Sequence, residues 1–174
     1  MEYVVLVDEQ DNETGVMEKL EAHEKGLLHR AISVFVFNSK GELLLQQRAL
    51  GKYHSAGLWT NTCCSHPRPD EKVAEAAVRR LKEEMGLECA LQEAFTFVYR
   101  SEYENGLTEH EYDHVFIGYS ESMPEPDINE VHCYKYIDLQ SLIEDVATNA
   151  QNYTTWFRIC LPLVKDYLQT QKEN

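Results

Sequence analysis

Apolar residues along the chain fall into short runs separated by turn-forming residues, a pattern typical of strands with a few helices. We predict strands at 2–8, 31–37, 42–48, 94–102, 111–119 and 131–137. Residues 38–41 should form a hairpin connection, and Asn105-Gly106 should turn the chain between the fourth and fifth strands. Helices are predicted at 70–85, 138–146 and 153–169. These elements favour the α/β (α+β) class, with a mixed sheet between helices.

The helix predicted at 70–85 has the clearest boundaries. Asp70 is a candidate N-cap, and Gly86 stands where a C-terminal cap belongs. One apolar stripe repeats between them with helical spacing: Val73, Ala76, Ala77, Leu81 and Met85. Two other segments are less regular. Residues 17–26 suit either a short helix or a loop, and Pro162 should kink or break the last helix.

Composition narrows the class of protein. The 174 residues suit a single domain over 1–174, and a chain of this size needs no disulfide to support its core. Sixteen basic and 30 acidic residues give a net charge of −14, which argues against nucleic-acid binding and against a polybasic membrane surface. No apolar stretch approaches the ~18 residues of a membrane span. The five cysteines lack CxxC spacing and indicate reduced thiols in a cytoplasmic protein.

The polar face of the 70–85 helix carries charges in a defined spacing. Glu71, Arg79, Glu83 and Glu84 fit the pattern E-x7-R-x3-E-E-x-G-U, where U is aliphatic. Arg80 lies one turn before Glu84 and can pair with it. Carboxylates on a helix beside a loop suit Mg²⁺, which takes one or two carboxylates together with substrate phosphate oxygens. A solvated helix with weak ion pairs is the other interpretation of the helix alone.

Residues 51–70 are rich in Gly, Pro, Ser, Asn, Cys and His, and we expect a loop that carries function. Within it, 59–67 read W-T-N-T-C-C-S-H-P, so two adjacent cysteines stand close to His66. A zinc site, a catalytic thiol and buried packing are all open, although zinc sites usually present Cys-x2–4-Cys pairs. Core packing is favoured for Cys63. For Cys64, beside a helix N-terminus and a metal-binding histidine, a lowered pKa is expected.

Acidic residues cluster at the start of the strand predicted at 111–119. Residues two apart share one face of a strand, so Glu109, Glu111 and Asp113 should point the same way. Like charges at this density favour a bound cation, whereas a solvated acidic edge that blocks aggregation is the alternative. Together with His29 and His66, Glu109 and Glu111 offer a mixed nitrogen and oxygen ligand set suited to Mn²⁺, Mg²⁺ or Zn²⁺.

Two resemblances connect these residues. The charged helix resembles the Nudix motif G-x5-E-x7-R-E-U-x-E-E-x-G-U, with Ser65 in place of the first glycine and Arg80 in place of a metal-binding glutamate. From about Val4 to Lys165, the chain resembles the type 1 isopentenyl-diphosphate isomerase family. The string T-N-T-C-C-S-H-P at 60–67 is the most specific part of this resemblance. Its other matching segments are 26–31, 47–48, 99–100, 109–111 and 153–156.

The family resemblance implies a Nudix-type α/β/α sandwich and the interconversion of isopentenyl diphosphate and dimethylallyl diphosphate. The implied catalytic residues are Cys64, Glu111, Tyr99 and Trp156. Cys64 and Glu111 would form the acid–base pair, and Trp156 would stabilise a carbocation through its ring. The implied ligands of a divalent ion, Mn²⁺, Zn²⁺ or Mg²⁺, are His23, His29, His66, Glu109 and Glu111.

A second ion, Mg²⁺, is implied between Glu84 and the substrate diphosphate. The implied cationic partners of the diphosphate are Lys19, Arg48, Lys52 and Arg80. The expected partner is therefore a small isoprenyl diphosphate, bound by a monomer. A Nudix diphosphatase and a non-catalytic diphosphate-binding module are the alternatives. Arg80 argues against hydrolysis, because it replaces a carboxylate that the hydrolases use.

Overall fold

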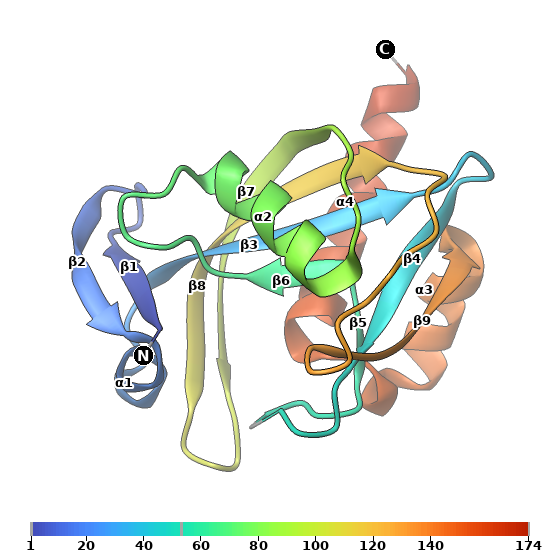
Figure 1. Ribbon diagram of the computed structural model, residues 1–174. Coiled ribbons are helices and arrows are strands. Elements are labelled where there is room, and N and C mark those ends of the chain that lie inside the picture. Colours follow the sequence, from blue (N-terminus) through green and yellow to red (C-terminus); the bar gives the residue numbers. More distant parts are fainter. Residues whose placement is uncertain (1, 53, 174) are drawn as a thin grey trace.

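The computed structural model describes residues 2–52 and 54–173. Strands and helices alternate along the chain, and the longest helix comes last (Figure 1). The strands are β1 (Tyr3–Val7), β2 (Glu13–Glu18), β3 (His29–Phe37), β4 (Glu42–Arg48), β5 (Trp59–Thr60), β6 (Cys63–Ser65), β7 (Leu91–Glu102), β8 (Thr108–Tyr119) and β9 (Val131–Asp138). The helices are α1 (Lys19–Lys25), α2 (Val73–Met85), α3 (Leu139–Thr148), the 3₁₀ turn η1 (Ala150–Asn152) and α4 (Thr155–Glu173).

Strand β3 lies at the centre of the sheet. It pairs in parallel with β8 over its whole length and antiparallel with β1, β4 and β6. On one side of β3, β8 forms an antiparallel hairpin with β7. On the other side, β4 pairs with β9 and β5. The sheet is therefore mixed, because one parallel pairing stands among antiparallel ones.

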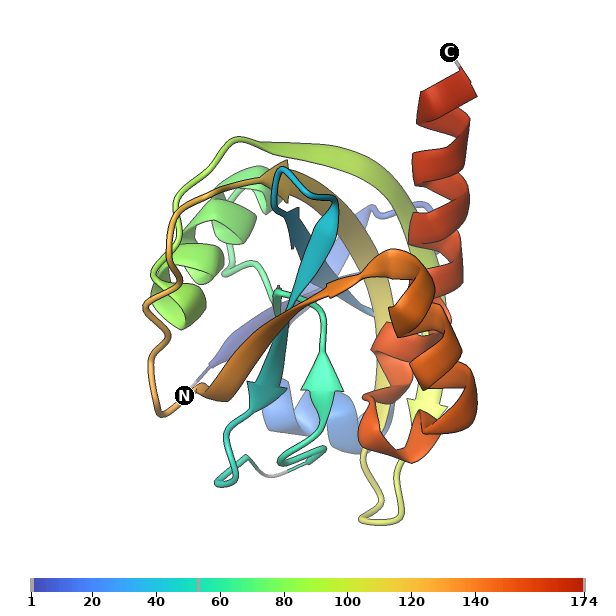
Figure 2. The same cartoon turned by 90° about the vertical axis from the view of Figure 1, so that its right-hand side faces the viewer.

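Side chains of β3 alternate between two cores, as the period of a strand requires. Val34 and Val36 pack with residues of α2, whereas Phe35 and Phe37 pack with residues of α3 and α4. Figure 2 shows the sheet between α2 on one side and α3 with α4 on the other. The predicted mixed sheet between helices is confirmed.

The predicted start of the α2 helix is wrong. The helix begins at Val73, and Asp70 instead adopts the left-handed conformation with φ of 65°. The Glu71 carboxylate accepts a hydrogen bond from the backbone N–H of Arg68 at 2.8 Å and two from the guanidinium of Arg79 at 2.6 and 2.7 Å. The turn before α2 is thus tied to the helix by Glu71, and Asp70 has no role as a cap.

The predicted end of α2 is confirmed. Gly86 has φ of 65°, and its N–H donates to the carbonyl of Lys82 at 3.0 Å. A Cβ on Gly86 would lie 2.6 Å from the backbone oxygen of Glu125. The N–H of Glu125 in turn donates to the carbonyl of Met85 at 2.8 Å, so the segment that leads to β9 packs directly on the end of α2.

Several elements differ from the expectation. The segment 51–70 is not a continuous loop, because the short strands β5 and β6 pair with β4 and β3. Strand β2 was not predicted; its residues are mostly exposed and lack a clear apolar period. In the segment 17–26, for which a short helix and a loop were both open, the structure has the short helix α1. Strands β3, β7 and β8 each begin two or three residues earlier than predicted.

Helix α4 runs through Pro162 without interruption, so the predicted break is wrong. Pro162 and Leu163 lie on the exposed side of the helix. A proline at 162 cannot donate to the carbonyl of residue 158, and on the exposed side of a helix water can satisfy such a carbonyl. None of the helices in the described residues is both long and apolar enough to cross a bilayer.

The close approach at Gly86 predicts a measurable stability difference. Gly86→Ala should lower the free energy of unfolding by more than the ~1–2 kcal/mol that a left-handed alanine alone costs, because its Cβ also meets Glu125. Equilibrium unfolding in urea measures this loss. Gly41→Ala is the matched control, since Gly41 has φ of 77° with nothing within 4 Å of the added Cβ. An equal loss in both variants would show that the contact with Glu125 contributes nothing.

Candidate active site

A cleft of about 80 Å³ opens where α1, β6, β8 and α4 meet. The family resemblance implied thirteen site residues. All of them except His29 line this cleft, namely Lys19, His23, Arg48, Lys52, Cys64, His66, Arg80, Glu84, Tyr99, Glu109, Glu111 and Trp156. His29 lies directly behind, with its Nε2 atom 3.6 Å from Oε1 of Glu111. Residues from eight elements (α1, β3, β4, β6, α2, β7, β8 and α4) and from their connections thus come together at one place.

Four potential metal ligands converge at one end of the cleft. One donor atom each from His23, His29, His66 and Glu111 lies within 4.8 Å of the others. Three local features produce this convergence. His23 is in the last turn of α1, His29 opposes Glu111 in the parallel β3–β8 register, and His66 follows β6, which also pairs with β3.

Backbone carbonyls orient two of the imidazole rings. Nδ1 of His23 lies 2.7 Å from the carbonyl of Lys19, and Nδ1 of His29 lies 2.8 Å from that of Leu27. A carbonyl can only accept, so each Nδ1 is protonated and each Nε2 offers a lone pair. Nε2 of His29 is buried and has no hydrogen-bond partner among the described residues.

These four residues fit a divalent metal ion. Burial lowers the pKa of His23 and lowers that of His66 to about 4, so both rings are neutral, as ligands must be. A buried lone pair without a partner costs free energy unless something binds it. A bound cation would satisfy Nε2 of His29 and offset the buried charge of Glu111.

Glu109 stands beside this group rather than within it. Its Oε2 atom accepts from the hydroxyl of Tyr103 at 2.6 Å and lies 3.3 Å from the hydroxyl of Tyr99. The Tyr99 hydroxyl donates to Glu111 Oε2 at 2.6 Å, so one phenol lies between the two carboxylates. Burial and then the charge of Glu111 raise the pKa of Glu109. Burial also opposes ionisation of Glu111, but the neighbouring imidazoles of His29 and His66 outweigh it and lower the pKa.

The interpretation of this strand as a solvated acidic edge is wrong. β8 is an inner strand between β3 and β7, and Glu109, Glu111 and Asp113 are all buried. Asp113 is the deepest of the three, and its Oδ2 atom accepts from the hydroxyl of Ser33 at 2.7 Å. The strand therefore carries its carboxylates into the protein and toward the metal ligands.

The adjacent cysteines of β6 face opposite sides of the sheet. Cys63 is fully buried in the core that contains α2, which confirms its predicted packing role. Cys64 faces the α4 side, where Nε1 of Trp156 donates to its Sγ atom at 3.0 Å. Both cysteines are free thiols.

The expected low pKa of Cys64 is wrong. Burial raises the pKa of this thiol, and the charges of Asp113 and Glu84 raise it further. Cys64 is in β6, nine residues before α2 begins at Val73, so the N-terminus of α2 does not follow it directly in the chain. The thiol therefore stays protonated, and its Sγ donates to Oδ1 of Asn61 at 2.8 Å.

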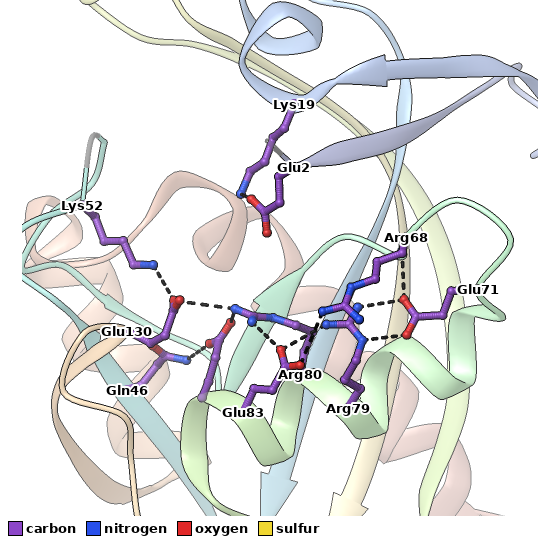
Figure 3. Close-up of polar contacts among 11 residues, drawn as sticks. Glu2, Lys19, Gln46, Lys52, Arg68, Glu71, Arg79, Arg80, Glu83 and Glu130 are labelled. Carbon is purple, nitrogen blue, oxygen red and sulfur yellow. Dashed lines mark hydrogen bonds and ion pairs between the residues drawn. The ribbon is translucent and has the colours of Figure 1, made fainter.

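The four predicted cationic residues line the same cleft. Nη2 of Arg80 contacts Glu84 Oε1 at 2.6 Å, as the helical spacing predicted, and Glu84 Oε2 accepts from the side-chain amide of Gln46 at 2.8 Å. Figure 3 shows Lys19 beside Glu2, and Lys52 and Arg80 on either side of Glu130. The guanidinium of Arg48 lies over the Trp156 ring, 5.1 Å from its centroid.

Sequence reasoning missed several residues of the site. Asn61 was quoted only as part of the T-N-T string, yet its Nδ2 donates to two backbone carbonyls, so that its Oδ1 is fixed toward Cys64. His54 lines the cleft, and Tyr103 contacts Glu109. Both lie in turns, where no sequence pattern predicts a place in the site. Burial and the charge of Arg48 lower the pKa of His54 to about 3. Glu130 gave no signal either, because nothing in its spacing connects it with Lys52 or Arg80.

The chain matches the family model of the NUDIX domain over residues 27–157. Isopentenyl-diphosphate Delta-isomerase 2 of Aromatoleum aromaticum is 53% identical to it over 161 residues, which cover 92% of this chain and 85% of that protein. Isopentenyl-diphosphate Delta-isomerase of Pectobacterium atrosepticum is 52% identical over 169 residues, which cover 97% of this chain and 94% of that protein. The chain belongs to the isopentenyl-diphosphate Delta-isomerase family. The family predicted from the residues is thus confirmed.

Solved structures extend the likeness to the fold. The crystal structure of DR0079 from Deinococcus radiodurans superposes with a TM-score of 0.77 at 18% identity, covering 92% of this chain and 98% of that chain. A MutT protein from Methanosarcina mazei gives a TM-score of 0.66 at 20% identity, covering 83% and 96%. At these identities the match concerns the fold alone. The predicted Nudix-type sandwich is confirmed.

The converging donors do not include Glu84, which predicts two metal sites with different behaviour. His66→Ala should lower the amount of metal that co-purifies with substrate-free protein, because it removes one of four converging donors. Glu84→Gln should leave that metal in place, since Glu84 contacts Arg80 and Gln46 instead. Elemental analysis of the purified variants measures both effects. Equal metal loss in the two variants would mean that one shared site exists.

Proposed function

We propose that this isomerase interconverts isopentenyl diphosphate and dimethylallyl diphosphate in the cleft between β8 and α4. The relatives carry that isomerase name over nearly the whole chain. One observation carries the assignment to this cleft: Cys64 and Glu111 line the same narrow space as Lys19, Arg48, Lys52 and Arg80. A substrate with an anionic diphosphate and an apolar alkene suits this combination of cationic and proton-transfer groups.

The reaction moves one double bond and needs one acid and one base. A proton added to the terminal alkene carbon gives a tertiary carbocation, and loss of a proton from the neighbouring methylene gives the isomer. We assign the two transfers to Cys64 and Glu111. The protonated thiol of Cys64 and the ionised Glu111 suit unlike roles. Tyr99, whose hydroxyl donates to Glu111 at 2.6 Å, would assist proton delivery there.

We propose that the divalent ion is held by His23, His29, His66 and Glu111, with Glu109 as a fifth ligand. Nitrogen and oxygen donors of this kind suit Mn²⁺, Zn²⁺ or Mg²⁺. When bound, the ion would supply positive charge that keeps Glu111 ionised inside the protein. The chain's own contribution is orientation, because backbone carbonyls fix the rings of His23 and His29.

We propose that Lys19, Arg48, Lys52 and Arg80 bind the diphosphate and that Glu84 holds the accompanying Mg²⁺. Guanidinium groups suit bidentate contacts with phosphate oxygens. Anchoring the diphosphate fixes the distance of the alkene from Cys64 and Glu111, which converts binding free energy into orientation. Aromatic and apolar walls, chiefly Trp156 and Tyr99, exclude the water that would trap a carbocation.

We further propose a single domain over 1–174 that acts in the cytoplasm as a monomer on a small isoprenyl diphosphate, without nucleic acid or membrane. Both hydrophobic cores share one sheet, which supports a single domain. The free cysteines suit a reducing compartment. The net charge of −14 disfavours nucleic acid and anionic lipid.

Substitutions at Cys64 and Glu111 test the proposal. The parent protein with Mg²⁺ should convert isopentenyl diphosphate to dimethylallyl diphosphate, as product analysis by chromatography would show. Cys64→Ala and Glu111→Gln should each abolish conversion, since each removes one of the two proton-transfer groups. Cys63→Ala should retain substantial activity, because Cys63 faces the core that contains α2.

The rival functions give different results in the same assay. Rapid release of phosphate from nucleoside diphosphate derivatives would favour a Nudix diphosphatase. Tight diphosphate binding without product would favour a binding module. Loss of activity in Cys63→Ala but not in Cys64→Ala would contradict the assignment within the pair.

The aromatic ring of Trp156 provides a second test. Trp156→Phe and Trp156→Leu both lose the N–H that donates to Cys64, so the two variants differ mainly in the ring. A desolvated cation–π contact contributes ~2 kcal/mol, which corresponds to roughly thirtyfold in rate. Trp156→Phe should therefore turn over about thirtyfold faster than Trp156→Leu, with similar substrate affinity and melting temperature. Equal turnover would make Trp156 a packing residue.

A further inference from the structure

Glu130 occupies the place between two of the cations that are proposed to bind the diphosphate. Its Oε2 atom forms an ion pair with Nζ of Lys52 and lies 3.6 Å from Nη2 of Arg80 (Figure 3). Glu130 also lines the cleft. The carboxylate of Glu130 thus contacts the cations that are proposed to bind the diphosphate, and it is negatively charged like the diphosphate itself.

The backbone holds Glu130 in this position from two sides. Its carbonyl accepts from the N–H of Ala49 at 3.0 Å, just after the end of β4, and its N–H donates to the carbonyl of Asp127 at 3.0 Å. The N–H of Asp127 donates to the carbonyl of Glu84 at 3.0 Å. The segment 125–130 therefore ties the strand that leads to Lys52 to the end of the helix that carries Glu84.

The side chain itself remains displaceable. About a quarter of it, 27%, is exposed, so water can replace Lys52 and Arg80 as its partners. Ion pairs at this exposure contribute at most about 1 kcal/mol to stability. The carboxylate of Glu130 therefore adds little to the stability of the fold. Its main effect is on the charge of the cleft.

Carboxylates match the cationic residues of the cleft in number. Among the described residues that line it, four are Lys or Arg (Lys19, Arg48, Lys52 and Arg80) and four are Glu (Glu84, Glu109, Glu111 and Glu130). A bare diphosphate would meet Glu84 and Glu130 beside Arg80 and would compete with Glu130 for Lys52 and Arg80. A diphosphate complexed with Mg²⁺ carries less negative charge, and its cation is attracted by Glu84 and Glu130.

We propose that Glu130 is a specificity-determining residue that makes the cleft select magnesium-complexed diphosphate over metal-free diphosphate. The carboxylate holds Lys52 and Arg80 in place while the cleft is empty. It then repels an uncomplexed polyanion more strongly than one whose charge Mg²⁺ has reduced. The inference rests on the proposed function, because it takes these cations to be the diphosphate anchors.

Calorimetric binding of inorganic pyrophosphate tests this selectivity. The purified protein, with its tightly bound metal retained, is titrated in buffer depleted of free Mg²⁺ and again with millimolar Mg²⁺. Glu130→Gln keeps the shape of the side chain and removes its charge. It should bind pyrophosphate about tenfold more tightly than the parent protein without Mg²⁺, and the gain in affinity on adding Mg²⁺ should shrink by a similar factor.

Two further variants separate this effect from simpler ones. Glu125→Gln removes the same charge from an exposed position of the same segment, and it should match the parent in both titrations. Glu130→Asp keeps the charge and should retain most of the dependence on Mg²⁺. The proposal is overturned if Glu130→Gln binds metal-free pyrophosphate no better than the parent, or if it loses affinity equally in both buffers. The second result would identify Glu130 as a purely structural ion-pair partner.

The outcome is independent of the isomerase assay. Failure of the parent protein to convert isopentenyl diphosphate would contradict the proposed function, whereas the pyrophosphate titrations would still measure selectivity. Failure of the parent to bind pyrophosphate in either buffer would remove the diphosphate anchors and with them the role of Glu130. Normal conversion by the parent with unchanged selectivity in Glu130→Gln would overturn the inference alone.

Discussion

The parallel pairing of β3 with β8 is the constraint on which the site depends. In this register His29 lies opposite Glu111, so a carboxylate is buried beside an imidazole. Burying these groups is costly unless each lone pair and charge finds a partner. The Tyr99 hydroxyl and His66 contact Glu111, while Nε2 of His29 still lacks a partner among the described residues. The fold thus leaves room for a cation at this point.

The two faces of the sheet carry different kinds of residues. Even-numbered residues of β3, such as Val34 and Val36, pack with α2 in a continuous apolar core. Odd-numbered residues of β8, such as Glu111 and Asp113, share their face with the α3 and α4 side. The same alternation separates the cysteines of β6, since strand residues one apart point to opposite faces. A shift of β6 by one residue would exchange the two cysteines between core and cleft.

The sequence predicted regular elements well wherever burial produces a clear period. The stripe of α2 and the cap at Gly86 follow from local chemistry, and the bounds of β4 matched. The short strands β5 and β6 depend on pairing partners far along the chain, so no local pattern revealed them. For the same reason Glu130, 46 residues after Glu84, could not be connected with the cleft. Sequence spacing alone could not show that the site residues lie close together, whereas the family resemblance predicted it. The pKa of Cys64 could not be predicted, because it depends on burial in the fold.

The charges along the cleft account for how an acidic protein can hold an anionic substrate. The chain carries a net charge of −14, so at long range it repels a diphosphate. Within the cleft, Lys52 and Arg80 lie beside Glu130, and Arg48 lies over the ring of Trp156. The cleft therefore offers an anionic diphosphate cationic partners, although the net charge of the chain opposes it at long range. Glu84 and Glu130 stand beside the cation Arg80, so the attraction of the cleft for a diphosphate and for a divalent cation depends on the same charge distribution.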